Sequence, residues 1–447
     1  MKEYISQQDL AAFSASFAAD PSRRIAQHAV TKNGIQKSAT VFGSQAEYCQ
    51  GFSVLVESGD VCDQKASGRC WMFASLNVMR LKVMENLNLK NMELSQSYPL
   101  FWDKLEKSNY FLENILSTLE EPTEGRLINW LLQGPVGDGG QWDMFRSLVA
   151  KYGVVPKDVM PESYSSSETR YLNKYLTLKL REFACTLREA YRAGEGLEQL
   201  RGRKDEMLCT IYRMLCVCLG EPPRTFTWET RDKDGNFVRV KDVTPVEFFQ
   251  RYVGWNLDDY VTVINAPTAD KPFGRTFSVQ TLGSVYGGAY PVKYLNLPVE
   301  ELKKIAIEQL KNGEAVWFGC DVGQFSERDN GIMAMDVLDV QGIFGTDFPM
   351  TKAQRLDYGE SLMTHAMVLT GVNLDEDGKP NRWRVENSWG KDPGRDGYYV
   401  MSDEWFSEFT YQILLNRKYF TPEQSAQFDT EPIQLMPWDP MGSLALD

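Results

Sequence analysis

Histidine is scarce in this chain, which has only His28 and His365 among its 447 residues. The zinc metallopeptidase motif requires two histidines four residues apart on one helix, and these two are far too distant in sequence to form it. Cys216 and Cys218 also lack a second pair of cysteines or histidines at ligand spacing. The sequence therefore predicts no metal centre, and histidine-dependent chemistry must use one of two residues.

The chain also lacks the features of exported, membrane-bound and nucleic acid-binding proteins. Its N-terminus has neither the basic nor the apolar region of a signal peptide, and no apolar run approaches the length of a bilayer-spanning helix. Eight cysteines are too few for a dense disulfide framework in a chain of this length. The net charge of −13 opposes binding to phosphate backbones. We expect a cytoplasmic globular protein with no membrane or nucleic acid partner.

Residues 64–71, QKASGRCW, carry the strongest chemical signal. Cys70 is followed by apolar residues at helical spacing, so it is predicted to begin a buried helix. A helix N-terminus stabilises negative charge and so favours the thiolate, which is the nucleophilic form of cysteine. Gln64 precedes Cys70 on the same turn, and its side-chain amide can donate a hydrogen bond to the oxyanion that forms when a carbonyl is attacked.

A base for Cys70 is predicted on a hairpin near the C-terminal end of the chain. His365 lies in an apolar run that predicts a strand, and a second strand after a Gly-containing turn leads to Asn387. The hairpin would place His365 beside Asn387, whose carbonyl can fix the imidazole tautomer and direct the other ring nitrogen to Cys70. Trp389 would shield this hydrogen bond from water.

These motifs resemble the papain-type cysteine peptidases, in which a cysteine, a histidine and an asparagine occur in that order. The resemblance is closer to the bleomycin hydrolase and bacterial aminopeptidase C family, and it covers nearly the whole chain. Ala66 departs from the polar residue that family members often have there, at a position without a chemical role. The stretches that carry the resemblance are AVTKNG at 29–34, QKASGRCWMFA at 64–74, FWDKLEK at 101–107, GGQWDM at 139–144 and NSWG at 387–390.

The resemblance implies an α+β papain-like fold, with a helical half that carries the nucleophile and a β-barrel-like half that carries the base. In this chain 295 residues separate Cys70 from His365, whereas papain-type enzymes have about 130–150. Two apolar patterns at helical spacing in the proline-free stretch 162–221 predict that the excess is a large helical insertion. The expected segments are an N-terminal arm (1–60), the helical half (61–150), the mainly helical insertion (151–260), the β half (261–440) and a C-terminal arm (441–447).

The predicted activity is that of a cysteine aminopeptidase that releases N-terminal residues from short peptides. Cys70 and His365 would form a thiolate–imidazolium pair, and Asn387 would orient His365. Gln64 and the Cys70 N–H would stabilise the oxyanion, and no cofactor is required. The resemblance further implies that the C-terminal arm lies in the active-site cleft, where Asp447 binds the α-ammonium group of the substrate. It also implies a homohexamer.

Two alternatives remain open. If the C-terminal arm is disordered, the chain would be a papain-like endopeptidase, or a hydrolase of non-peptide amides and thioesters. The other alternative is a non-catalytic scaffold of the same fold. Cleavage of blocked peptides would indicate the first, and failure of a thiol-directed inhibitor to label Cys70 would indicate the second.

Overall fold

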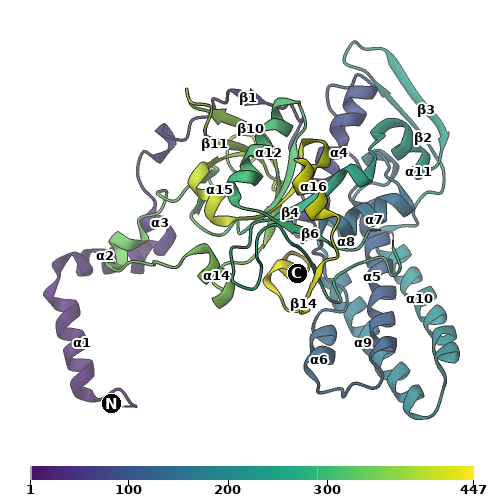
Figure 1. Ribbon diagram of the computed structural model, residues 1–447, viewed down its shortest axis with the longest axis horizontal. Helices are drawn as coiled ribbons and strands as arrows, with labels where there is room; N and C mark the ends of the chain where they lie inside the picture. Colours follow the sequence, from purple (N-terminus) through teal and green to yellow (C-terminus); the bar gives the residue numbers. More distant parts are fainter. Residues whose placement is uncertain (1–2, 289, 447) are drawn as a thin grey trace.

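The computed structural model describes residues 3–288 and 290–446, and its helical half forms around the helix that begins at Cys70 (Figure 1). This helix is buried from Cys70 to Arg80 because it contacts both a neighbouring helix and the central strands of the sheet. The predicted start of a buried helix at Cys70 is therefore confirmed. The helices of this half are α4 (Cys70–Asn86), α5 (Ser97–Ser117), α6 (Arg126–Gln133) and α7 (Trp142–Tyr152).

The insertion extends the helical half. Its helices are α8 (Tyr164–Ser167), α9 (Arg170–Arg192) and α10 (Leu197–Leu219). The apolar spacing that predicted a helix corresponds to α9, which buries Leu172, Leu176 and Leu180 on one face. Helices α9 and α10 pack against α5 and against each other. A hairpin of β2 (Phe226–Arg231) and β3 (Phe237–Val243) follows, which the sequence did not predict. The domain boundaries proposed from the sequence stay predictions.

The other half is built on a large mixed sheet with the order β14-β5-β6-β4-β13-β7-β10-β11-β12-β9-β8, and β1 also pairs with β10. Strands β10 and β11 form the predicted antiparallel hairpin, and β7 pairs with the other edge of β10. The strands are β1 (Val54–Leu55), β4 (Tyr260–Ile264), β5 (Thr276–Val279), β6 (Tyr294–Asn296), β7 (Val316–Cys320), β8 (Ser326–Glu327), β9 (Ile332–Met333), β10 (His365–Leu374), β11 (Pro380–Glu386), β12 (Tyr398–Ser402), β13 (Thr410–Asn416) and β14 (Ile433–Leu435).

An N-terminal arm projects from the body of the molecule (Figure 1). It consists of α1 (Gln7–Ala19), α2 (Pro21–Asn33) and α3 (Ile35–Ala39). Helix α1 begins with a capping box between Ser6 and Asp9, and all of its residues are at least partly exposed. The arm expected from the sequence is therefore helical.

The remaining helices cover the sheet or connect its strands. Across residues 3–288 and 290–446, no helix has the length and apolar character of a transmembrane span. These helices are α11 (Pro245–Phe248), α12 (Val299–Lys311), α13 (Val340–Phe344), α14 (Lys352–Tyr358), α15 (Asp403–Phe409) and α16 (Pro422–Phe428). Shorter helical turns are η1 (Ser44–Ala46), η2 (Lys157–Val159), η3 (Phe249–Val253), η4 (Leu257–Asp259), η5 (Arg417–Tyr419) and η6 (Pro440–Ala445).

Candidate active site

The hairpin places His365 and Asn387 side by side, at the start of β10 and just after the end of β11. Their Nε2 and Oδ1 atoms are 2.9 Å apart. The Ser388 N–H donates to the same Oδ1 atom at 2.7 Å, so this oxygen is an acceptor. His365 must therefore donate from Nε2, which leaves Nδ1 as its basic nitrogen. The predicted contact between His365 and Asn387 is therefore present, and the Ser388 N–H determines the tautomer of His365.

The surroundings of His365 are apolar. The imidazole is buried, and the ring of Trp389 lies over it at a centroid distance of 4.8 Å. Burial lowers the pKa of His365 to about 4, and the hydrogen bond with Asn387 opposes this shift. Burial alone thus favours a neutral imidazole, and a thiolate beside it would be needed to hold the imidazolium form at neutral pH.

Gln64 is held by the residue that follows Asn387. Ser388 Oγ donates to Gln64 Oε1 at 2.6 Å, and Gln64 N donates to Ser388 O at 2.8 Å. The amide Nε2 donates to Ser67 O at 2.6 Å. An amide nitrogen carries two N–H groups in one plane. The bond of the first N–H to Ser67 O therefore also fixes the direction of the second. Hydrogen bonds to both ends of the Gln64 amide therefore hold its orientation.

Cys70 is buried at the first position of α4, and α4 packs against β10 and β7. The next residue anchors the helix in the interface between the two halves. Trp71 Nε1 donates to Asp138 O at 2.7 Å, and Trp317 Nε1 on β7 donates to Trp71 O at 3.2 Å. The start of the helix is thereby tied to both halves of the molecule.

The C-terminal segment docks beside this site. Gly140 N donates to Leu444 O at 3.0 Å, and Ser443 Oγ donates to Met363 O at 2.9 Å. Leu444 is buried, with 1% of its surface exposed. Because Met363 lies two residues before His365, the segment bridges the helical half and the residues that lead into β10, the strand that carries the proposed base. Asp447, the predicted ligand of the substrate ammonium group, lies outside the described residues.

The base of this segment is anchored by charge. Asp439 accepts a hydrogen bond from Met441 N at 2.9 Å, which caps η6. Its carboxylate also pairs with Lys271 at 2.9 Å, and both side chains are largely buried. The preceding residue, Trp438, packs its ring against the Arg126 guanidinium at 3.6 Å. These contacts come from both halves of the molecule and fix where the segment starts.

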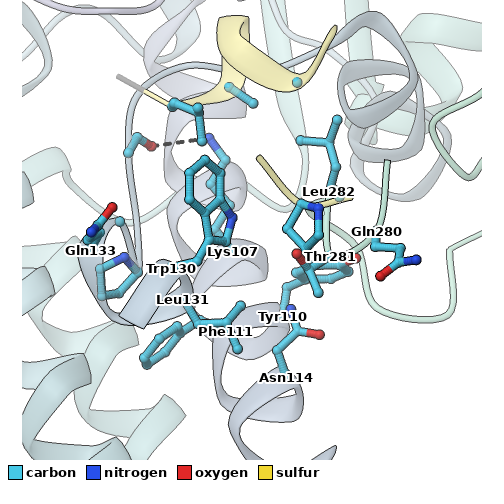
Figure 2. Close-up of a pocket in the computed structure, with 18 of the residues that line it drawn as sticks. Lys107, Tyr110, Phe111, Asn114, Trp130, Leu131, Gln133, Gln280, Thr281 and Leu282 are labelled. Atoms are coloured by element: carbon cyan, nitrogen blue, oxygen red, sulfur yellow. Dashed lines mark hydrogen bonds between the residues drawn. The ribbon is translucent and has the colours of Figure 1, made fainter. Parts of the chain in front are cut away.

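A cavity of about 230 Å³ lies beside the C-terminal segment (Figure 2). Figure 2 shows Trp130 of α6 and Leu282 on opposite sides of it, with Tyr110 and Asn114 of α5 further from the C-terminal segment. Ala445 is among its lining residues. The C-terminal segment therefore forms part of the wall of this cavity, whose other walls come from α5, α6 and residues 280–283.

Sequence reasoning missed two residues that organise the site. Ser388 lies within the NSWG motif, but its contact with Gln64 joins residues 324 positions apart. Asp138 lies in the Gly-rich stretch 137–140. Its carboxylate accepts a hydrogen bond from Gly68 N at 2.9 Å, two residues before the proposed nucleophile. The signal available in the sequence was an acidic residue between two glycines.

Comparisons with known proteins agree with this geometry. The model of the peptidase C1-like family matches residues 4–442. The chain is 48% identical to aminopeptidase C of Listeria monocytogenes over 100% of both chains. It is 42% identical to human bleomycin hydrolase over 99% of each. The crystal structure of PepW from Lactobacillus rhamnosis HN001 superposes with a TM-score of 0.97 at 49% identity, covering 99% of each chain.

The α+β papain-like fold and the resemblance inferred from the sequence are confirmed by these matches. Their coverage extends through the insertion and the N-terminal arm, so the likeness is not limited to the motifs around the nucleophile. The chain belongs to the peptidase C1-like family of cysteine peptidases, together with aminopeptidase C and bleomycin hydrolase.

Proposed function

We propose that this chain is a cysteine aminopeptidase that releases N-terminal residues one at a time from short peptides. The observation that carries the proposal is the fixed tautomer of His365, which donates from Nε2 to Asn387 and keeps Nδ1 as a base. Relatives named aminopeptidase C, about half identical over nearly the full length, support the same reaction.

Proton transfer and attack follow from this arrangement. His365 Nδ1 takes the proton of Cys70, and the thiolate attacks the scissile carbonyl carbon. The second N–H of Gln64 and the backbone N–H of Cys70 donate to the oxyanion, and one such donor is worth about 2.7–4 kcal/mol. The imidazolium then protonates the leaving amine, and the thioester remains on Cys70.

Water completes the cycle. His365 removes a proton from water, the hydroxide attacks the thioester carbonyl, and the departing Cys70 thiolate is restored as the acid is released. Asn387 holds the imidazole orientation in both half-reactions. The mechanism requires neither a metal nor an organic cofactor.

The C-terminal arm would restrict this chemistry to free N-termini. The buried Leu444 and its bond to Gly140 support an arm that lies in the cleft. From this position the arm would block subsites beyond the first residue, and the carboxylates of Asp447 would pair with the α-ammonium group of the substrate.

Assembly and location belong to the same proposal. We place the protein in the cytoplasm, as a homohexamer whose N-terminal arms contact neighbouring copies. Helix α1 exposes Leu10, Phe13 and Phe17, and an isolated helix of this length is marginal in water. An exposed apolar helix that stands away from its own domain needs a partner surface. Sedimentation of the full chain beside a Leu10→Asp, Phe13→Asp variant tests this assembly, and an unchanged molecular mass in the variant would contradict it.

The decisive experiment compares the full chain with a deletion of residues 444–447 on two substrates. One is an aminoacyl amide with a free α-amine, and the other is the same residue within an N-acetylated peptide. The full chain should cleave only the first, and the deletion should cleave the second as well. Cleavage of both by the full chain would instead indicate an endopeptidase. Failure of a thiol-directed inhibitor to label Cys70 would indicate a non-catalytic scaffold.

A further inference from the structure

The loop between Gln64 and Cys70 is bonded to the insertion. Ala66 N donates to Ser167 O at 2.9 Å, and Thr169 N donates to Ala66 O at 3.3 Å. These bonds form a short parallel bridge between Ala66 and Glu168. The middle of the catalytic loop is thus fixed against the segment that leads into α9.

A chain of hydrogen bonds leads from the insertion to Gln64. Glu162 accepts both terminal N–H groups of Arg69 at 3.0 Å each, and Arg69 Nε donates to Ser67 Oγ at 2.9 Å. The Ser67 hydroxyl donates to Gln64 O at 2.6 Å, and Ser67 O is the acceptor that orients the Gln64 amide. Arg69 is 0% exposed, so this bidentate pair lies where charge-assisted hydrogen bonds are strong.

Asp138 ties the same loop to the insertion at a second point. Its Oδ2 atom accepts from Gly68 N at 2.9 Å and from Thr169 Oγ1 at 2.5 Å. Its Oδ1 atom accepts from Asn173 Nδ2 at 2.8 Å and from Lys104 Nζ at 2.7 Å. The loop is therefore held from two directions, and both involve residues between 162 and 173.

We propose that Glu162 and Arg69 are positioning residues for the oxyanion site, because Arg69 holds the hydroxyl of Ser67, the residue whose carbonyl directs the Gln64 amide. The inference rests on the proposed Cys70 chemistry and gives the insertion a part in it. Loss of a whole oxyanion donor lowers kcat by about 10²–10³. Misdirecting that donor by loosening Ser67 should lower kcat by about tenfold or more, because the Cys70 N–H still contributes.

The test uses Glu162→Gln and Arg69→Met in the full chain, with Glu113→Gln as the matched control. Glu113 on α5 pairs with Lys204 of α10 at a buried contact, so its substitution weakens the same insertion away from the loop. Two readouts are needed. The first is kcat and KM on an aminoacyl amide, and the second is the pH profile of Cys70 alkylation by iodoacetamide, which needs no oxyanion site.

Glu162→Gln and Arg69→Met should both lower kcat about tenfold or more, with KM and the alkylation profile within twofold of wild type. Glu113→Gln should leave kcat, KM and the alkylation profile unchanged. The proposal is wrong if Glu162→Gln keeps the wild-type kcat, or if Glu113→Gln lowers kcat as much as Glu162→Gln does. It is also wrong if Glu162→Gln and Arg69→Met move the pKa of the Cys70 thiol in opposite directions, as a direct charge effect would. An inactive wild type refutes the proposed function instead, and a wild type that cleaves blocked peptides leaves this inference intact.

Discussion

Substituting Gly139 by alanine should displace the C-terminal segment without touching a proposed catalytic side chain. A Cβ atom at this position would lie 2.3 Å from the Leu444 carbonyl oxygen and 3.1 Å from Ala445 Cα. Real Cβ atoms do not approach backbone that closely, so one of the two segments must move. Gly139 lies in a loop that is bonded on both sides, with its carbonyl accepting from Lys107 at 2.6 Å. The C-terminal segment is therefore the part that should yield.

The size of the effect follows from the contacts that would be lost. Moving the segment breaks the bond from Gly140 N to Leu444 O, which is worth about 0.5–1.5 kcal/mol. It also exposes the buried Leu444 side chain, which costs about 1.5–3 kcal/mol. Together these give about 2–4.5 kcal/mol, or a roughly 30- to 1,600-fold change in the ratio of docked to undocked segment.

The assay is the ratio of kcat/KM for an N-acetylated peptide to that for the matching free aminoacyl amide. Gly139→Ala should raise this ratio at least tenfold, chiefly through new cleavage of the blocked peptide. Gly134→Ala is the control, because a Cβ atom there has nothing within 4 Å. If Gly139→Ala is folded and still requires a free amine as strictly as wild type, the docked segment is not what selects the substrate.

Three further predictions concern the residues around the nucleophile. Asn387→Ala should lower kcat/KM by about 12- to 150-fold, because a hydrogen bond to a charged group is worth about 1.5–3 kcal/mol. Asn373→Ala, which replaces a partly buried asparagine on β10 of the same hairpin, should have no effect. In Cys70→Ala, which has no thiolate, His365 should titrate near pH 4 by NMR. Because folding lowers the pKa of His365, the unfolded chain binds more protons than the folded one. The free energy of unfolding should therefore fall by about 3 kcal/mol as pH decreases from about 6.5 to about 4. A His365 titration above pH 6.5 would contradict the burial argument. Arg80→Met removes the cation that lies 2.8 Å from the buried Glu386 carboxylate, so it should lower the free energy of unfolding by about 3–5 kcal/mol. The double variant Arg80→Met, Glu386→Met should lower it by less, because no buried charge is left unpaired. Effects in urea unfolding that simply add would argue against this coupling.

The parts of the site that were predicted from the sequence depend on local patterns. The helix at Cys70 and the hairpin that joins His365 to Asn387 each follow from apolar periodicity and turn residues within a few dozen positions. The helix α9 follows in the same way from leucines at helical spacing. Short-range patterns of this kind need no knowledge of the rest of the fold.

The contacts that orient these groups were not predicted, because they join distant segments. The Ser388–Gln64 hydrogen bond and the Ala66 bridge to Glu168 depend on how the insertion and the two halves pack. Nothing in the local sequence of either partner specifies the other. The strand order of the sheet was missed for the same reason, since it depends on tertiary pairing. The β2–β3 hairpin is different, because it is a local pairing around a turn at 232–236 that contains Asp-Gly, a signal that the sequence carries.

One loop contacts both the residues just before Cys70 and the C-terminal segment. The carboxylate of Asp138 accepts a hydrogen bond from Gly68 N, two residues before the proposed nucleophile. At Gly140 its backbone N–H holds Leu444 of the C-terminal segment. A shift of this loop would therefore change the geometry at Cys70 and the position of the segment together. This coupling is the reason to measure thiol alkylation and the blocked-to-free substrate ratio on the same variants: Gly139→Ala should move the ratio and leave alkylation unchanged, whereas Asp138→Asn should move both.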